Sequence, residues 1–168
     1  MEHLWAPWRM QFIDELRKKA GGCVFCEAAL PGDDRQRLVL YRGKSCFILM
    51  NRFPYNNGHL LIIPYRHTGS LAELTGDEHA EMLRLCANSA DVMAKAIEAE
   101  GFNCGFNIGK VAGAGITDHV HLHVVPRWLG DTNFMPIIGD TRSMPEYLER
   151  TYDRLKPGFE KMAGGANI

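Results

Sequence analysis

The feature of this chain that most constrains its fold is a five-residue segment, His119 to His123, in which histidine alternates with an aliphatic residue. Side chains of a β-strand point alternately to opposite faces. An extended segment would place Val120, Leu122 and Val124 on one face and line three imidazoles along the other. A helix would scatter the imidazoles, because residues two apart on a helix do not face each other. Packing does not call for three imidazoles in a row, so the segment predicts a strand with one face built for chemistry.

Length and composition predict one globular domain spanning residues 1–168. The chain is 46% hydrophobic and 23% charged, which is typical of a folded rather than a disordered protein. The net charge of −1 argues against a nucleic-acid partner, which would need a basic excess. No apolar run approaches the length of a membrane span, so we expect no membrane partner.

The N-terminus and the cysteines predict a cytoplasmic location. Charged residues interrupt the apolar N-terminal segment, which is therefore not a signal peptide. The five cysteines are an odd number, which favours a reducing compartment with free or metal-bound thiols over disulfides.

The pattern of apolar residues predicts an α+β domain with a mostly antiparallel sheet, one long helix and one C-terminal helix. The long helix begins at a capping box, Thr75 to Glu78, carries an apolar stripe from Leu83 to Ile97, and ends at Gly101. Residues 1–22 form an N-terminal arm whose two tryptophans must dock on the domain or on a partner chain. Pro157-Gly158 should end the last helix, leaving 159–168 as a poorly ordered tail. Strands are expected over residues 37–41, 45–50, 59–64, 102–109 and 119–123.

The central histidine of the segment, His121, is the candidate nucleophile. An imidazole with a pKa near 6.5 is largely neutral at pH 7 and can attack phosphorus to form a covalent intermediate. His119 and His123 could fix its tautomer or bind phosphate oxygens. Two alternatives stay open: the histidines could ligate a metal, or the face could be polar without any function.

The loop that leads into this segment also suits phosphate chemistry. It runs from Asn107 to Asp118 and contains Gly113 and Gly115, so backbone N–H groups could approach an anion closely. The alternative is a flexible turn.

Cys23 and Cys26 have the spacing of a zinc knuckle. A tetrahedral site would need two further ligands, for which His67 and His119 are candidates. Reduced structural cysteines and a redox dithiol are the competing interpretations.

These residues resemble the signature of the histidine triad (HIT) superfamily, His-φ-His-φ-His-φ-φ, which residues 119–125 match. A second family pattern matches from Asn51 through Pro54, Gly58 and His59 to Leu61, and the resemblance extends over residues 23–158. Segments 5–9 and 126–134 resemble the bacterial diadenosine tetraphosphate phosphorylase-like branch, related to the fragile-histidine-triad branch.

The resemblance implies an enzyme that transfers or hydrolyses nucleotidyl groups at an α-phosphate, paired as a homodimer or larger symmetric oligomer. It assigns the nucleophile to His121, with His119, His123 and His59 as supporting groups. It places Asn51 against the ribose of a nucleotide substrate and Asn107 near the phosphate.

One departure from the family pattern concerns the acceptor. Other branches have Gln-Ser or Gln-Thr where this chain has Gly115-Ile116, so Thr117 is the residue left to supply a hydroxyl. This leaves open whether water or inorganic phosphate accepts the nucleotidyl group. The resemblance also implies a structural zinc held by Cys23, Cys26, His67 and His119, and no organic cofactor.

Two other function classes remain to be weighed against this interpretation. One is a metal-dependent hydrolase that uses the three histidines as ligands. The other is a non-catalytic nucleotide-binding sensor that signals through its dimer surface.

Overall fold

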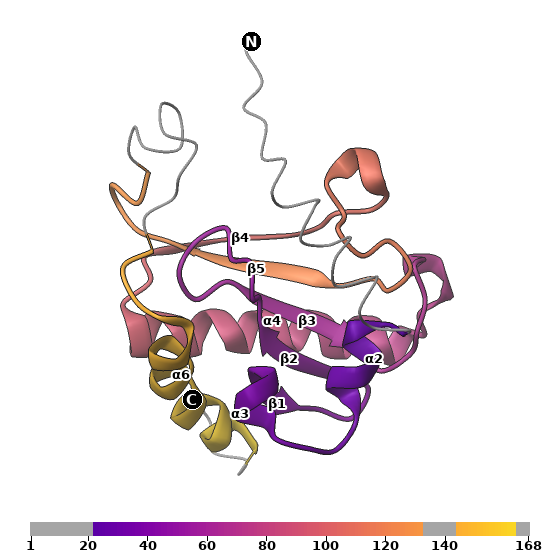
Figure 1. Ribbon diagram of the computed structural model, residues 1–168, viewed down its shortest axis with the longest axis horizontal. Coiled ribbons are helices and arrows are strands. Elements are labelled where there is room, and N and C mark those ends of the chain that lie inside the picture. The colour runs from indigo at the N-terminus through magenta and orange to yellow at the C-terminus, as the bar shows by residue number, and fades with distance from the viewer. Residues whose placement is uncertain (1–21, 133–143, 164–168) are drawn as a thin grey trace.

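The computed structural model describes residues 22–132 and 144–163 and shows a single sheet flanked by helices (Figure 1). The arm tryptophans and the last five residues of the predicted tail lie outside these ranges. The sheet has five antiparallel strands in the order β1-β2-β3-β5-β4, which confirms the predicted fold class. The strands are β1 (Val39–Arg42), β2 (Cys46–Met50), β3 (Leu60–Pro64), β4 (Gly101–Phe106) and β5 (Leu122–Arg127).

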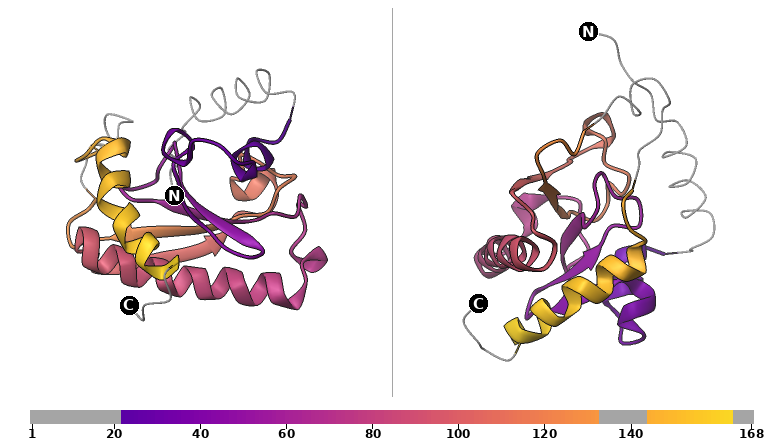
Figure 2. Two further views of the ribbon diagram at one scale, coloured as in Figure 1. Left: turned by 90° about the horizontal axis from the view of Figure 1, so that it is seen from below. Right: turned by 90° about the vertical axis from the view of Figure 1, so that its left-hand side faces the viewer.

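Helices cover the two faces of the sheet unequally (Figure 2). α4 (Gly76–Ile97) and α6 (Leu148–Ala163) pack over one face and enclose the larger apolar core. The short α2 (Val24–Ala29) packs on the opposite face, where Phe25 and Ala28 form a second, smaller core. The remaining elements are α3 (Asp34–Arg37) and the 3₁₀ turns η1 (Leu71–Glu73) and η2 (Lys110–Ala112). The face with α2 therefore has room for a site, whereas the α4 face is filled by core.

The long helix begins as its sequence predicts and ends earlier. Thr75 and Glu78 form the predicted capping box. The helix ends at Ile97, with Glu98 in the left-handed conformation, whereas the predicted cap Gly101 already starts β4. The predicted apolar stripe is correct at Met93 and Ile97, which are buried, and wrong at Leu83, which is 66% exposed. The core side also carries Met82, Leu85, Ser89 and Val92.

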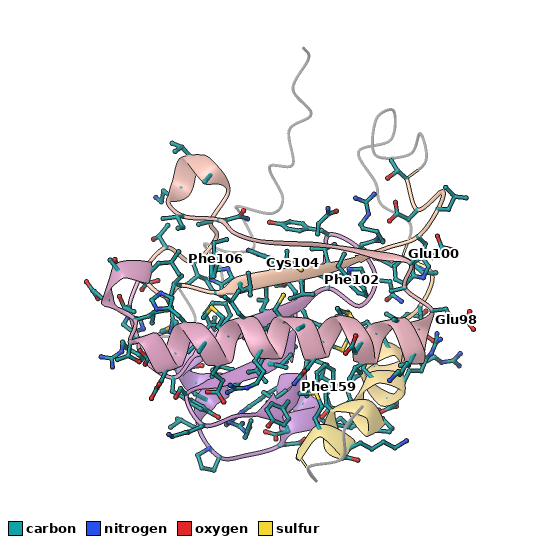
Figure 3. All side chains as sticks on the ribbon, turned by 180° about the vertical axis from the view of Figure 1, so that it is seen from behind. Glu98, Glu100, Phe102, Cys104, Phe106 and Phe159 are labelled. Atoms are coloured by element: carbon teal, nitrogen blue, oxygen red, sulfur yellow. The ribbon has the colours of Figure 1, made fainter. Side chains whose placement is uncertain are left out.

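The predicted end of the last helix at Pro157-Gly158 is wrong, because α6 continues to Ala163. A proline inside a helix costs about 3 kcal/mol. The completely buried ring of Phe159 lies between α6 and α4 and offsets this cost (Figure 3). A Cβ atom at Gly158 would lie 2.6 Å from Val92 Cγ1, so the glycine allows the two helices to approach closely. Gly158 therefore serves helix packing, whereas Pro157 is exposed.

Other boundaries also differ from the prediction: β4, expected to run to residue 109, ends at Phe106. β5 starts at Leu122, so the first histidines of the segment precede the strand. Residues 34–37 form the helix α3, although the predicted first strand began at residue 37. The Asp33 side chain caps this helix by accepting a hydrogen bond from the backbone N–H of Gln36. Within the described ranges, no helix is long and apolar enough to cross a membrane.

Candidate active site

The structure divides the histidine segment between two neighbouring sites. His121 and His123 lie on the sheet face that carries α2, and the aliphatic residues between and after them enter the core under α4. The ring of His119 instead meets Cys23 and Cys26. The single row of three imidazoles is interrupted at His119 because the strand begins only at Leu122.

The tautomer of His121 follows from one hydrogen bond. Its Nδ1 lies 2.9 Å from the carbonyl oxygen of His119. A carbonyl can only accept, so Nδ1 carries the proton and Nε2 carries the lone pair. Burial lowers the pKa of His121, which favours the neutral ring. His121 is thus a neutral imidazole with a nucleophilic Nε2, and the main chain of His119, rather than its side chain, sets this state.

His59 and His123 form a second connected pair. His59 Nε2 lies 2.9 Å from His123 Nδ1, and both rings are buried. His59 directly precedes β3, and Leu61 of β3 pairs with His123 of β5, which brings the two histidines together. The ring of His123 is 4.9 Å from that of His121. The pair therefore lies directly beside the candidate nucleophile.

Asn51 supports this pair. Its Oδ1 accepts the backbone N–H of Phe53 at 3.0 Å, and its Nδ2 lies 3.3 Å from His59 Nδ1. Both ends of the amide thus contact the protein in the turn between β2 and β3. The ribose contact that the family resemblance implies stays a prediction.

Two aromatic residues in the site were missed by the sequence analysis. Phe25 packs 4.9 Å from His121 and 5.5 Å from His119, measured between ring centroids. Tyr55 stacks on His59 and His123 at 4.7 and 5.5 Å. The position of Phe25 between the two knuckle cysteines was the available signal, whereas Tyr55 occupies an unspecified position of the family pattern between Pro54 and Gly58.

Cys23, Cys26, His67 and His119 form one cluster whose ligand atoms all lie within 4.8 Å of one another. The cysteine sulfurs are 3.3 and 3.7 Å from His119 Nδ1, Cys26 Sγ is 3.3 Å from His67 Nδ1, and the two Nδ1 atoms are 3.3 Å apart. Zn–N bonds of about 2.0 Å and Zn–S bonds of about 2.3 Å would separate tetrahedral ligands by roughly 3.3–3.8 Å. Both the donor set and the spacing fit zinc.

A hydrogen bond also prepares His119 as a ligand. Its Nε2 donates to the Pro64 carbonyl at 2.9 Å, which leaves Nδ1 unprotonated and facing the cysteines. Burial, followed by the neighbouring Cys23, raises the pKa of the Cys26 thiol. A cation at the centre would reverse this effect and favour the thiolate.

The loop between β4 and β5 closes the other side of the site. Asn107 Nδ2 donates to the Tyr55 hydroxyl at 3.0 Å, and Gly113 adopts a positive φ of 87° beside Asn107. A Cβ atom on Gly69 would lie 2.5 Å from the Thr117 carbonyl, so the loop packs against the segment that carries His67. The phosphate contacts expected of Gly113, Gly115 and Thr117 stay predictions.

The sheet presents a neutral histidine with an unprotonated Nε2 beside a hydrogen-bonded histidine pair, which agrees with the histidine triad signature. The HIT domain profile matches residues 34–128, and the chain belongs to the HIT family. It is 37% identical over 157 residues to AP-4-A phosphorylase of Mycobacterium tuberculosis, covering 90% of this chain and 80% of that protein.

Solved structures agree with this assignment. A Zn-bound histidine triad family protein from Mycobacterium smegmatis superposes with a TM-score of 0.68 at 26% identity, covering 87% of this chain and 99% of that one. A hypothetical histidine triad nucleotide-binding protein from Sulfolobus tokodaii has a TM-score of 0.65 at 26% identity, covering 83% and 93%.

Proposed function

We propose that this chain is an enzyme that cleaves a phosphorus–oxygen bond at the α-phosphate of dinucleoside polyphosphates or related adenylylated compounds. The observation that carries the proposal is the hydrogen bond from His121 Nδ1 to the His119 carbonyl, which leaves Nε2 as a buried nucleophile. The relatives support the substrate class. Besides the AP-4-A phosphorylase, a bis(5'-nucleosyl)-tetraphosphatase of Schizosaccharomyces pombe is 33% identical over 93 residues, 55% of this chain and 50% of that protein.

The reaction proceeds in two displacements. The lone pair of His121 Nε2 forms a bond to the α-phosphorus, and the bond to the leaving phosphate oxygen breaks with its electron pair. The His121 ring becomes a cation whose Nδ1–H remains on the His119 carbonyl. An acceptor oxygen then attacks phosphorus, loses its proton to solvent, and returns the electron pair to Nε2. The backbone N–H groups of residues 107–117 stabilise the charge on the phosphoryl oxygens, and His123 lies beside His121.

The acceptor is either water or inorganic phosphate. The similarity to a phosphorylase is the reason to test inorganic phosphate beside water as the acceptor. Incubation with diadenosine tetraphosphate, with and without inorganic phosphate, distinguishes the two. Chromatography should find ATP and AMP after hydrolysis, or ATP and ADP after phosphorolysis. A folded protein that binds AMP and yields neither product pair would instead be a sensor.

The four-residue cluster is proposed to hold one structural zinc. The fit of its sulfur and nitrogen atoms to a tetrahedron and the Zn-bound mycobacterial relative support this assignment. When bound, the metal links α2 to the segment that carries His121. Thiolate ligands of this kind require reducing conditions, in keeping with a cytoplasmic location. Elemental analysis of protein purified without chelators should find one zinc per chain.

A metal-dependent hydrolase with the triad as ligands is less favoured, because His119 is separated from His121 and His123 by its contacts. A chelator distinguishes the two mechanisms. A covalent intermediate that still forms after metal removal from folded protein would exclude the triad-ligand mechanism.

We also propose that the protein is a homodimer that pairs through β4 and α4. β4 is an edge strand whose central residues Asn103 and Cys104 are exposed, with Phe102 and Phe106 half-buried on either side (Figure 3). On α4, Leu83 is 66% exposed. Exposed edge strands invite pairing with another chain. Light scattering should show a dimer at micromolar concentration, and Cys104→Glu should weaken it; a monomeric parent protein would contradict the proposal.

A further inference from the structure

Tyr55, in the turn before β3, makes four contacts that converge on the histidine pair. Its backbone N–H donates to His59 Nδ1 at 3.1 Å, and its hydroxyl accepts from Asn107 Nδ2 at 3.0 Å. Its ring stacks on His59 with an interplanar angle of 25° and on His123 with an angle of 24°. One residue therefore touches both supporting histidines and the loop that follows β4.

The backbone contact of Tyr55 determines the protonation of two rings in succession. A backbone N–H can only donate, so His59 Nδ1 must be an acceptor and the ring proton lies on Nε2. That proton is donated to His123 Nδ1 at 2.9 Å. Because His123 Nδ1 accepts this proton, His123 is a neutral ring whose own proton lies on Nε2. The Asn51 amide reinforces this order, since its Nδ2 is a second donor to His59 Nδ1.

The ring of Tyr55 determines where these protons point. Stacked aromatic rings prefer nearly parallel, offset planes, and each such pair contributes about 0.5–1.5 kcal/mol. The Tyr55 plane lies nearly parallel to both imidazoles, so it limits their rotation. The hydroxyl bond to Asn107 anchors the ring from the opposite end.

We propose that Tyr55 is a positioning residue that holds His59 and His123 in one tautomer and orientation, so that His123 presents an Nε2–H to the leaving oxygen. This proposal rests on the proposed function. The His123 Nε2–H donates a hydrogen bond as the phosphorus–oxygen bond breaks, and no proton needs to move along the pair. Tyr55 itself touches neither phosphorus nor the leaving group.

The kinetic test compares three variants with diadenosine tetraphosphate. Tyr55→Leu removes the stack and should lower kcat about a hundredfold with KM within about threefold, because misplacing a supporting group by about 1 Å has this effect. Tyr55→Phe keeps the stack and should lose less than about tenfold. Tyr41→Leu, which changes a half-buried tyrosine of β1 at the far edge of the sheet, is the matched control and should match the parent.

A second test does not depend on turnover. Proton–nitrogen correlation spectra of the histidine rings should show His59 and His123 protonated on Nε2 in the parent protein. Replacing residue 55 by the hydroxy acid analogue of tyrosine turns its N–H into an ester oxygen, and should mix the tautomers of His59 while the stack remains. Unmixed tautomers in the ester protein, or a Tyr55→Leu protein with unchanged spectra and kcat, would overturn the proposal. A parent protein with the expected spectra but no turnover would refute the proposed function and leave the tautomer assignment standing.

Discussion

The two histidine sites begin on one short segment and use opposite ring nitrogens. At His119, the Pro64 carbonyl takes the Nε2 proton and leaves Nδ1 for the Cys/His cluster. At His121, the His119 carbonyl accepts a hydrogen bond from Nδ1–H and leaves Nε2 with the lone pair that the proposed mechanism uses. The residue type is the same, so the difference lies in which nitrogen a backbone carbonyl occupies. Backbone geometry, rather than side-chain identity, leaves Nδ1 of one imidazole unprotonated toward the Cys/His cluster and Nε2 of the other unprotonated in the candidate active site.

The largest effect should follow from removing the nucleophile. His121→Ala should lower kcat by at least about 10⁴-fold, as loss of a covalent nucleophile does in other enzymes, while the variant stays folded and binds AMP. Turnover is measured by chromatography of the products and folding by circular dichroism. His79→Ala, which changes an exposed histidine of α4, is the control. Substantial activity in the His121 variant would exclude the covalent mechanism.

Disrupting the Cys/His cluster should lower the stability of the protein more than its kcat. Cys23→Ser should remove bound zinc and lower the Tm by at least about 8 °C, because the binding energy of a structural metal is folding energy. The kcat of the remaining folded protein should change less than its stability does. Cys104→Ser, an exposed cysteine outside the cluster, should keep the metal and so controls for the loss of a thiol. Equal thermal curves for the Cys23 variant and the parent would remove the structural role of the metal.

Phe25 joins the two sites, so its substitution should affect both. The ring is 5% exposed and contacts His119 and His121. Phe25→Leu should cost about 1–2 kcal/mol of unfolding free energy and lower kcat about tenfold, because the nucleophile ring loses a packing surface. Phe47→Leu in the same small core tests packing alone and should cost similar stability without the loss in kcat. If both variants have the same kcat, Phe25 is only a core residue.

The sequence predicted the strands, the sheet and the two sets of reactive side chains because these depend on short-range patterns. Short continuous apolar runs gave β2 and β3 to within one residue, and the capping box gave the start of α4. The Cys-x-x-Cys spacing and the family resemblance together selected the four residues that the structure gathers into one cluster.

What the sequence could not predict depends on contacts between distant segments. The direction of the His119 ring is set by Pro64 and by cysteines more than ninety residues away. The extension of α6 past Pro157 depends on the fit of Gly158 against Val92. Tyr55 becomes part of the site only when the turn folds over β5. None of these contacts leaves a periodic or local signal in the chain.

The smallest expected effect concerns Asn51, whose side-chain amide contacts His59 of the histidine pair. Asn51→Ala removes one hydrogen bond to His59 and should lower kcat about fivefold, in line with about 1 kcal/mol for such a bond. Because that contact involves no sugar, kcat should fall equally for substrates with ribose and with 2'-deoxyribose. A ribose contact would appear separately, as a rise in KM with the ribose substrate alone. Asn88→Ala on α4, far from the turn in sequence, is the control. An unchanged kcat with both substrates would show that Asn51 does not support the histidine pair. Tyr55 would then be the residue of this turn that positions His59 and His123.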